Sequence, residues 1–580
     1  MKRRGLLFLA CILVAAAGAL AFRLPRLAVR PMHCDEANQA MRAAVLLETG
    51  RYRYDPQEHH GPSLYYATLP SFWLSGVQDF AESDEFNYRI VPVVFGTGLI
   101  LLLLMVGDGL GRPACVVAAI LMALSPAMVF YSRYFVQEML LVFLTFATIA
   151  CGWRYVRRPS IGWAAAVGAG FGLMHATKET WILAAAAMGI SLVLTIAWAR
   201  FRNNNAGTVG NALRGVSGPQ ERVSSPLRGT PQRAFPTGFS FHVLKTYFRP
   251  LPVLAAVLTA VLVAGIFYSS FGTNWQGPID SVLAYTTYVR RGSEGGNHSH
   301  PWYYYLEILV AYRPSRGFFW TEGLLVGLAL IGSCAALFGR GKKPAACGDA
   351  SDDRPCSGPD WGFCRFLAFY AIALTAIYSA IPYKTPWCLL SFLHALILLA
   401  GVGAVAVVCW MPCRSTKVAA ALVLSAATVH LGWESYALNF RFPSYEGRNP
   451  YVYAHASGDV LNLAAQLERL ARISPEGHAM GIHVVTRENY WPLPWYLRRF
   501  DASRIGYWQD PAQWRRDAQR QPAPSLIILT DDAQPTVDAS LRAAYNRQMS
   551  YGLQPGVRLS VYAREDLWDA FVKSMESPAR

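Results

Sequence analysis

Residues 253–267 read VLAAVLTAVLVAGIF, an apolar stretch without a single charged residue. Residues 99–106 (LILLLLMV) show the same pattern, with no alternation of apolar and polar positions. Apolar windows of about 20 residues match the hydrocarbon thickness of a bilayer. The 580-residue chain is 53% hydrophobic and only 16% charged, whereas soluble domains contain roughly a quarter charged residues. The sequence therefore predicts a polytopic α-helical membrane protein and argues against a cytosolic enzyme or a disordered chain.

Eleven apolar runs qualify as membrane spans. The first run follows the basic residues Lys2, Arg3 and Arg4, a pattern shared with cleavable signal peptides. We expect a membrane helix instead, because no clear small-residue cleavage site precedes Arg23. The expected spans lie near residues 6–22, 91–106, 114–130, 139–153, 160–176, 181–199, 251–271, 318–338, 366–382, 387–411 and 417–433.

Basic residues gather in alternate loops between these runs. Those in one set of loops are Arg112, Arg154, Arg157, Arg158, the basic residues of 200–249, Arg340, Lys342, Lys343, Arg414 and Lys417. Cytoplasmic loops are enriched in Lys and Arg, so this set indicates a cytoplasmic amino terminus. An odd number of spans then places the carboxy-terminal tail outside the membrane. These topology signals also explain the net charge of +16, from 53 basic and 37 acidic residues, so we expect no nucleic-acid partner.

The chain divides into two expected domains. Residues 1–433 form a transmembrane module, and residues 434–580 form a small extracytoplasmic α/β domain. The tail has strand candidates at 483–486 and 526–530 and a helix candidate at 461–472. Within the module, we expect a first outer loop over 23–90, with amphipathic helices near 36–48 and 62–76 that lie in the interface. Asn-, Gly-, Ser- and Pro-rich sequence predicts a flexible cytoplasmic loop over 200–249.

Ionisable residues gather at one face of the predicted bundle. The acidic pair Asp35 and Glu36 opens the first outer loop, and Arg133, Lys178 and Lys384 lie in other connections on the same side. Ionisable residues at a bilayer boundary are costly and tend to be functional. Each cation alone could be a snorkelling anchor at a helix end. Because these cations and the two carboxylates lie on the same face, we expect them to form a functional site.

Sugar transfer from a polyprenyl phosphate requires this set of groups at a membrane surface. The departing phosphate gains negative charge, which preorganised cations stabilise most where water is scarce. The acceptor hydroxyl must lose its proton to a nearby carboxylate. The sequence has no Gly-rich phosphate loop or Rossmann fingerprint, so a nucleotide-sugar donor or an ATP-driven pump finds no support.

Several segments resemble the GT-C membrane glycosyltransferases, a superfamily that includes protein O-mannosyltransferases and the aminoarabinose transferase of lipid A. The similarity lies in residues 33–37 (HCDEA), 132–138 (SRYFVQE), Lys178, 382–387 (PYKTPW) and 486–496 (TRENYWPLPWY). It runs over residues 1–500 and is greatest to a prokaryotic branch labelled archaeal flippase activity-associated proteins. It implies a GT-C-like bundle, a polyprenyl-phosphate-sugar donor and an inverting transfer to a hydroxyl acceptor.

The resemblance also implies roles for individual residues. Asp35 is the catalytic carboxylate and Glu36 supports it. Arg133 lies near the reacting groups and, with Lys178 and Lys384, binds the donor phosphate.

The resemblance implies supporting roles for five further residues. Glu58 and His59 fall where some relatives place a metal-binding or donor-positioning group, which leaves room for a divalent cation. Glu138 replaces the usual Asp of the Ser-Arg turn, so a structural ion pair with Arg133 is an equally good role for it. His33 and Tyr383 belong to the motifs that carry the resemblance.

Two other functions remain open from the sequence. A lipid-linked glycan translocase or flippase-accessory protein would use the same cations to bind phosphate headgroups, but it needs charges inside the spans, where Glu322 and His394 are isolated. A tail that acts as a glycan receptor would use Trp491, Trp495 and Tyr496 to stack on sugars. Aromatic residues next to prolines more often pack a domain, and eleven spans exceed what an anchor needs.

Overall fold

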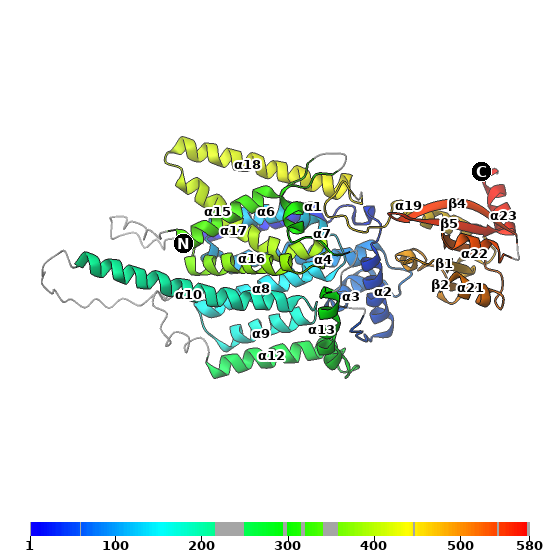
Figure 1. The fold of residues 1–580 in the computed structure, drawn as a ribbon, viewed down its shortest axis with the longest axis horizontal. Coiled ribbons are helices and arrows are strands. Elements are labelled where there is room, and N and C mark those ends of the chain that lie inside the picture. The colour runs from blue at the N-terminus through cyan, green and yellow to red at the C-terminus, as the bar shows by residue number, and fades with distance from the viewer. Residues whose placement is uncertain are drawn as a thin grey trace.

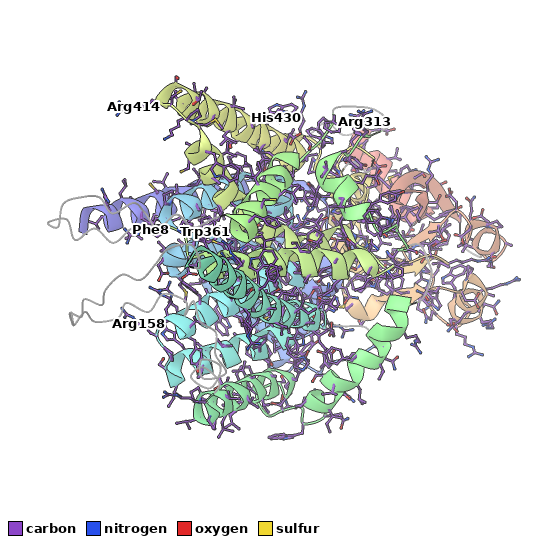
Figure 2. The ribbon with its side chains drawn as sticks, turned by 60° about the vertical axis from the view of Figure 1, so that its left-hand side comes forward. Phe8, Arg158, Arg313, Trp361, Arg414 and His430 are labelled. Carbon is purple, nitrogen blue, oxygen red and sulfur yellow. The ribbon has the colours of Figure 1, made fainter. Side chains whose placement is uncertain are left out.

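The computed structural model describes residues 2–57, 60–214, 249–293, 298–314, 319–339, 358–444, 447–541 and 544–576. Long helices lie side by side along the longest axis of the molecule, with a β-sheet at one end and the amino terminus at the other (Figure 1). We call the end of the helical bundle that faces the sheet the sheet-proximal end. Arg158 and Arg414 lie at the opposite end (Figure 2).

All eleven expected spans fall on helices. Within the described residues, eight helices are long and apolar enough to cross a membrane, and three shorter apolar helices occupy the remaining positions. The helices are α1 (Lys2–Arg23), α4 (Glu85–Leu102), α6 (Arg112–Leu124) with α7 (Pro126–Tyr131), α8 (Gln137–Arg157), α9 (Ile161–His175), α10 (Trp181–Arg214), α12 (Pro250–Tyr268), α15 (Gly323–Phe338), α16 (Trp361–Ala380), α17 (Leu390–Trp410) and α18 (Arg414–Tyr436). The polytopic helical architecture is therefore confirmed.

Two of these helices differ from their expected form. The span expected at 114–130 is broken between α6 and α7, because Pro126 has no N–H to continue α6 and instead begins α7 behind the Ser125 cap. Helix α10 continues to Arg214, so the start of the loop expected to be flexible over 200–249 is helical. Residues 215–248 of that loop lie outside the described residues.

Small residues bring the central helices α15 and α17 together. A methyl group on Gly332 would lie 2.1 Å from the Leu399 carbonyl oxygen, and one on Gly403 would lie 1.9 Å from that of Leu328. Such distances leave no room for any side chain. Glycine at both positions lets the two backbones touch, as small residues commonly do between membrane helices.

Shorter helices gather at the sheet-proximal end. The expected helices in loop 23–90 are confirmed as α2 (Cys34–Thr49) and α3 (Ser63–Ser75). Two further helices, α13 (Gly277–Ser293) and α14 (Tyr304–Val310), follow α12 and were not predicted. Helices α2 and α13 lie crosswise to the long helices (Figure 1). The remaining short elements of the bundle are the 3-10 turns η1 (Leu27–Val29), η2 (Leu103–Met105) and η3 (Pro386–Leu389), helix α5 (Gly107–Leu110) and the π-turn η4 (Ala437–Arg441).

The tail contains a five-stranded mixed sheet in the order β2-β1-β3-β5-β4. The two expected strands are confirmed as β1 (Ile482–Val485) and β3 (Leu526–Thr530), which lie next to each other in parallel. The other strands are β2 (Ile505–Trp508), β4 (Tyr545–Gln554) and β5 (Val557–Arg564). The helices are α19 (Asp459–Ile473), which confirms the expected helix, α20 (Leu493–Tyr496), α21 (Pro511–Ala518), α22 (Gln534–Asp538) and α23 (Glu565–Glu576), with 3-10 turns η5 (Gly477–Ala479) and η6 (Ala502–Arg504).

The aromatic segment of the tail packs against loop 23–90. Trp495 is fully buried, and its indole N–H donates to Glu85 at 3.2 Å. The Tyr496 hydroxyl accepts from the Met32 N–H at 2.9 Å. The Arg498 guanidinium stacks on the Trp495 ring, 3.8 Å from its centroid. Trp495 and Tyr496 thus dock the tail on the bundle, and neither side chain is open for stacking on a sugar.

Candidate active site

The acidic pair begins helix α2, and His33 sets its position. The His33 ring accepts from the Asp35 N–H at 3.0 Å, while the Glu36 carboxylate accepts from the His33 N–H at 3.2 Å. This reciprocal cap satisfies two backbone donors that the first helical turn leaves free. Successive residues of a helix point about 100° apart, so the two carboxylates enter different environments.

Glu36 is a fully buried member of an ion-pair network. Its two oxygens accept from the Arg89 guanidinium at 2.8 and 2.7 Å, and the Phe135 N–H donates to it at 2.9 Å. Arg30 lies 3.7 Å away. Burial alone would raise the pKa of Glu36, but Arg89 and Arg30 lower it to about 2. Glu36 therefore supports the position of α2 and has no oxygen available for a substrate.

Asp35, unlike Glu36, is partly exposed to solvent. Its side chain is 47% exposed, and His33 Nδ1 is 3.8 Å from its nearer oxygen. In the described part of the chain, no lysine or arginine forms an ion pair with it. A carboxylate that is open and unneutralised can accept a proton from a bound hydroxyl.

His33 connects Asp35 to the segment that leads into the tail. Because its Nδ1 accepts the Asp35 N–H, its Nε2 carries the proton and donates to the Tyr453 carbonyl at 3.1 Å. The Tyr453 hydroxyl in turn lies 2.6 Å from His298 Nδ1. Burial lowers the pKa of His33, which agrees with a neutral ring held in one tautomer.

Lys384 lies at the far end of this series of contacts. Its N–H donates to the His298 carbonyl at 2.9 Å. Its ammonium donates to the carbonyls of Ile381 and His300, and no carboxylate of the described residues pairs with it. The side chain is buried, and desolvation lowers its pKa. Backbone carbonyls accept hydrogen bonds but do not neutralise a charge. The Lys384 ammonium therefore has no counter-ion among the described residues, and an anionic ligand could supply one.

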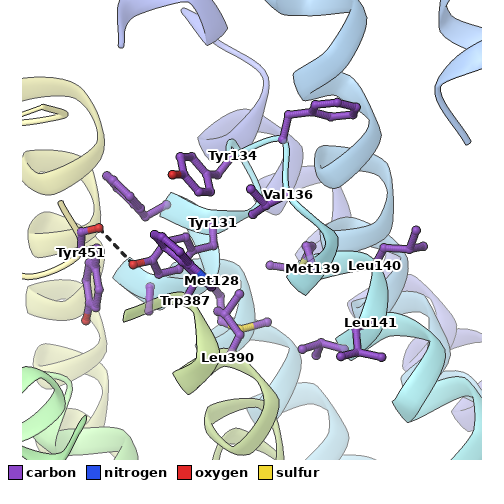
Figure 3. Close-up of a cluster of buried hydrophobic side chains, with 14 of the residues drawn as sticks. Met128, Tyr131, Tyr134, Val136, Met139, Leu140, Leu141, Trp387, Leu390 and Tyr451 are labelled. Atoms are coloured by element: carbon purple, nitrogen blue, oxygen red, sulfur yellow. Dashed lines mark hydrogen bonds between the residues drawn. The ribbon is translucent and has the colours of Figure 1, made fainter. Parts of the chain in front are cut away.

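Aromatic side chains pack around His33 and around the segment that carries Lys384. Trp387 contacts both His33 and Tyr134, with ring centroids 5.9 and 5.8 Å apart, and Tyr134 and Trp387 lie on facing elements in Figure 3. Tyr383 is 41% exposed, and its ring centroid lies 4.8 Å from that of His298. Asp35, His33, Tyr383 and Lys384 are thus brought together at the sheet-proximal end.

Lys178 and Glu138 form a separate, buried ion pair. The sequence suggested Arg133 as the partner of Glu138, and the structure corrects this to Lys178. Burial opposes the charged form of Lys178, but Glu138 beside it raises its pKa overall. Because its charge is neutralised, Lys178 is less suited than Lys384 to hold a phosphate.

The Arg133 side chain forms its hydrogen bonds with backbone carbonyls. Its guanidinium donates to the carbonyls of Arg23, Pro25 and Arg26 at 2.7–2.9 Å and stacks on Phe440. The cavity beside it has a volume of about 10 Å³, which is room for about one water. These contacts hold the end of α1 in place and engage both terminal nitrogens of the Arg133 guanidinium, while its expected role at the donor phosphate stays a prediction.

Loop 23–90 closes over the turn between α9 and α10. Glu179 accepts from His60 at 2.7 Å and from the Tyr54 hydroxyl at 2.9 Å. A methyl group on Gly61 would lie 2.3 Å from the Ala176 carbonyl oxygen, so the loop backbone rests directly on the turn. The candidate residues Glu58 and His59 lie outside the described residues.

A divalent cation finds a poor set of ligands next to Asp35. Within the described residues, potential ligand atoms of His33, Cys34 and Asp35 lie within 4.8 Å of one another. However, His33 Nδ1 already accepts the helix-capping bond, and burial raises the pKa of the Cys34 thiol well above its usual value. Metal ligands must be deprotonated and have a free lone pair, so these residues do not fit a metal.

Three groups near the site were missed from the sequence. Arg89 lies two residues before the span expected at 91–106, in helix α4, so its burial against Glu36 was not expected. Tyr453 and His298 come from loops more than 150 residues apart, and no local pattern marks them. Only the folded chain brings them together.

Comparisons with known proteins show a partial family match and a similar overall fold. The family described as dolichyl-phosphate-mannose-protein mannosyltransferase matches residues 65–214. Two crystal structures of ArnT from Cupriavidus metallidurans, one bound to undecaprenyl phosphate and one in the apo state, are similar in fold. For each, the TM-score is 0.55 and the identity 14%, over 97% of this chain and 98% of that chain. No curated protein matches the sequence.

Proposed function

We propose that this protein is a membrane glycosyltransferase that moves a sugar from a polyprenyl-phosphate donor to a hydroxyl acceptor. The family match and the ArnT-like fold indicate a polyprenyl-phosphate-sugar glycosyltransferase. The undecaprenyl phosphate bound to the similar ArnT supports the same class of donor here. The observation that carries the proposal is that an open carboxylate, Asp35, is linked through contacts of His33, Tyr453 and His298 to the segment of Lys384, a buried cation without a carboxylate partner among the described residues.

The geometry supports a single displacement. The acceptor oxygen forms a bond to the anomeric carbon as the bond from that carbon to the donor phosphate oxygen breaks. The acceptor proton goes to the Asp35 carboxylate, and the electron pair leaves with the phosphate. Lys384 stabilises the charge that develops on this phosphate, in a site where its attraction is little weakened by water. Attack from the side opposite the phosphate inverts the anomeric configuration.

We place the site at the outer face of the membrane, and the tail domain on the same side. Arg158 and Arg414 lie at the end of the bundle opposite the sheet (Figure 2), as expected for cytoplasmic loops. The segment at 486–496 favours the prokaryotic branch named above within the wider group.

Cell-free transfer with the purified protein tests the proposal. A polyprenyl-phospho-sugar labelled in the sugar is mixed with detergent-solubilised membrane lipids, and labelled product is separated from donor by extraction and chromatography. We expect label in a new product and release of polyprenyl phosphate in equal amounts. Movement of intact donor across proteoliposomes without release of polyprenyl phosphate would instead establish the translocase function.

Replacing Lys384 by glutamine should weaken use of the donor. A hydrogen bond to a charged group contributes about 1.5–3 kcal/mol, so we expect the KM for the donor to rise about tenfold to a hundredfold. Steady-state kinetics at varied donor concentration measure this. Lys178→Gln is the variant for comparison. It leaves Glu138 buried without a partner, so we expect a lower unfolding temperature for this variant. An unchanged donor KM in Lys384→Gln would remove this residue from the phosphate site.

A further inference from the structure

A second basic feature lies at the sheet-proximal end, apart from Asp35 and Lys384. It is an open cleft of about 400 Å³ between α2, the loop that follows it and the loop after α12. Its lining residues are Arg42, Val45, Arg51, Tyr52, Arg53, Thr273 and Asn274. We call it the arginine cleft. Three guanidinium groups line it and no acidic residue does.

The three arginines of the cleft have no side-chain partners among the described residues. Arg42, Arg51 and Arg53 make no ion pair and donate no side-chain hydrogen bond within the described residues. Arginine forks match the oxygens of phosphate, and several together indicate an anion with more than one acceptor oxygen. The unpaired donors therefore favour a phosphate group as the ligand.

Exposed apolar side chains flank the cleft on the same loop. Phe271 is 61% exposed and Trp275 is 79% exposed, on either side of Thr273 and Asn274. Helix α13 follows directly and exposes Ile279 and Val282. Aromatic side chains beside apolar helix faces are typical of a membrane interface. An anion held next to such an apolar surface fits the headgroup of a lipid.

The cleft is aligned with Asp35 along one helix. Arg42 follows Asp35 by seven residues in α2, which is about 10 Å along the axis and within about 20° of the same helical face. A headgroup whose phosphate contacts Arg42 could therefore present a hydroxyl at Asp35 if one sugar-sized unit separated the two.

We propose that the arginine cleft binds the phosphate of an anionic lipid headgroup and that this lipid is the acceptor of the transferred sugar. The second half of the proposal rests on the proposed transferase function. The first half does not, because binding of an anionic lipid can be measured without any transfer.

Lipid binding tests the cleft directly. Purified full-length protein is titrated with dioleoyl phosphatidylglycerol or dioleoyl phosphatidylcholine, and bound lipid is counted by native mass spectrometry. We expect preferential binding of phosphatidylglycerol, weakened about tenfold or more by Arg51→Gln or Arg53→Gln and further by their combination. Both side chains are exposed, so folding should be unaffected. Arg487→Gln, an exposed arginine of the tail, is the matched control and should change nothing.

The remaining outcomes separate the sources of the anion and the two halves of the proposal. Full displacement of phosphatidylglycerol by millimolar inorganic phosphate would overturn the lipid assignment, as would equal binding by the variants and the control. In the transfer assay, the variants should raise the KM for lipid acceptor and leave the KM for donor unchanged. Label found in protein instead of lipid would overturn the acceptor assignment. Loss of lipid preference with transfer intact would overturn the cleft as acceptor site but leave the transferase function standing.

Discussion

Replacing Asp35 by asparagine should lower the rate of sugar transfer about 10²–10⁴-fold, the usual contribution of a general base. The amide keeps the size of the side chain but cannot accept the proton of the acceptor hydroxyl. Because Asp35 is half exposed and pairs with no lysine or arginine of the described residues, the variant should fold normally and still bind donor. Single-turnover transfer with labelled donor, together with a donor-binding measurement, checks both expectations.

A matched control is available in the same loop. Asp79 is exposed and caps a turn through the Glu82 N–H, a hydrogen bond that asparagine can also accept. Asp79→Asn should therefore retain full activity. Activity of Asp35→Asn within a factor of two of the parent would exclude Asp35 as the base.

Replacing Arg89 by methionine should produce the largest loss of stability. The change leaves Glu36 fully buried without its bidentate partner, and breaking a buried ion pair in this way costs about 3–5 kcal/mol. We expect a clearly lower midpoint of thermal unfolding for the purified protein in detergent. A midpoint within one degree of the parent would show that Arg30 and the Phe135 N–H suffice to hold the Glu36 carboxylate.

Acidification gives an independent measure of the same pair. The pKa of Glu36 is lowered to about 2 from its usual 4.5. A depressed pKa stabilises the folded state fully above pH 4.5, and this stabilisation is lost as the pH falls from 4.5 towards 2. The double variant Glu36→Gln with Arg89→Met should lack this component of the pH dependence and unfold at a higher temperature than Arg89→Met alone.

The membrane architecture could be predicted because it depends on local composition. Each expected span is a run of apolar residues whose length alone matches a helix across a bilayer, and each falls on a helix. The strands β4 and β5 were harder to predict. They pair only with β3 or with each other, and their residues have no strong apolar run.

The chemistry of individual side chains was harder still. Lys178 and Lys384 look equivalent in the sequence, since each follows an apolar span. The structure separates them, because Glu138 neutralises one, whereas the ammonium of the other donates to backbone carbonyls and pairs with no carboxylate of the described residues. Arg133 likewise was expected near the donor phosphate, and its carbonyl partners could not be predicted because they lie more than 100 residues away.

Asp35 and Glu36 show which features follow from the sequence alone and which require the tertiary structure. The amino-acid sequence by itself determined that this chain crosses a membrane repeatedly and that two adjacent carboxylates begin a helix at one end of the bundle, because hydrophobic length and helix capping act over a few residues. Only the tertiary structure decided that Arg89 pairs with Glu36 and that Asp35 stays partly exposed, without a lysine or arginine partner among the described residues. Burial and charge pairing depend on which distant segments meet, and no local pattern carries that information.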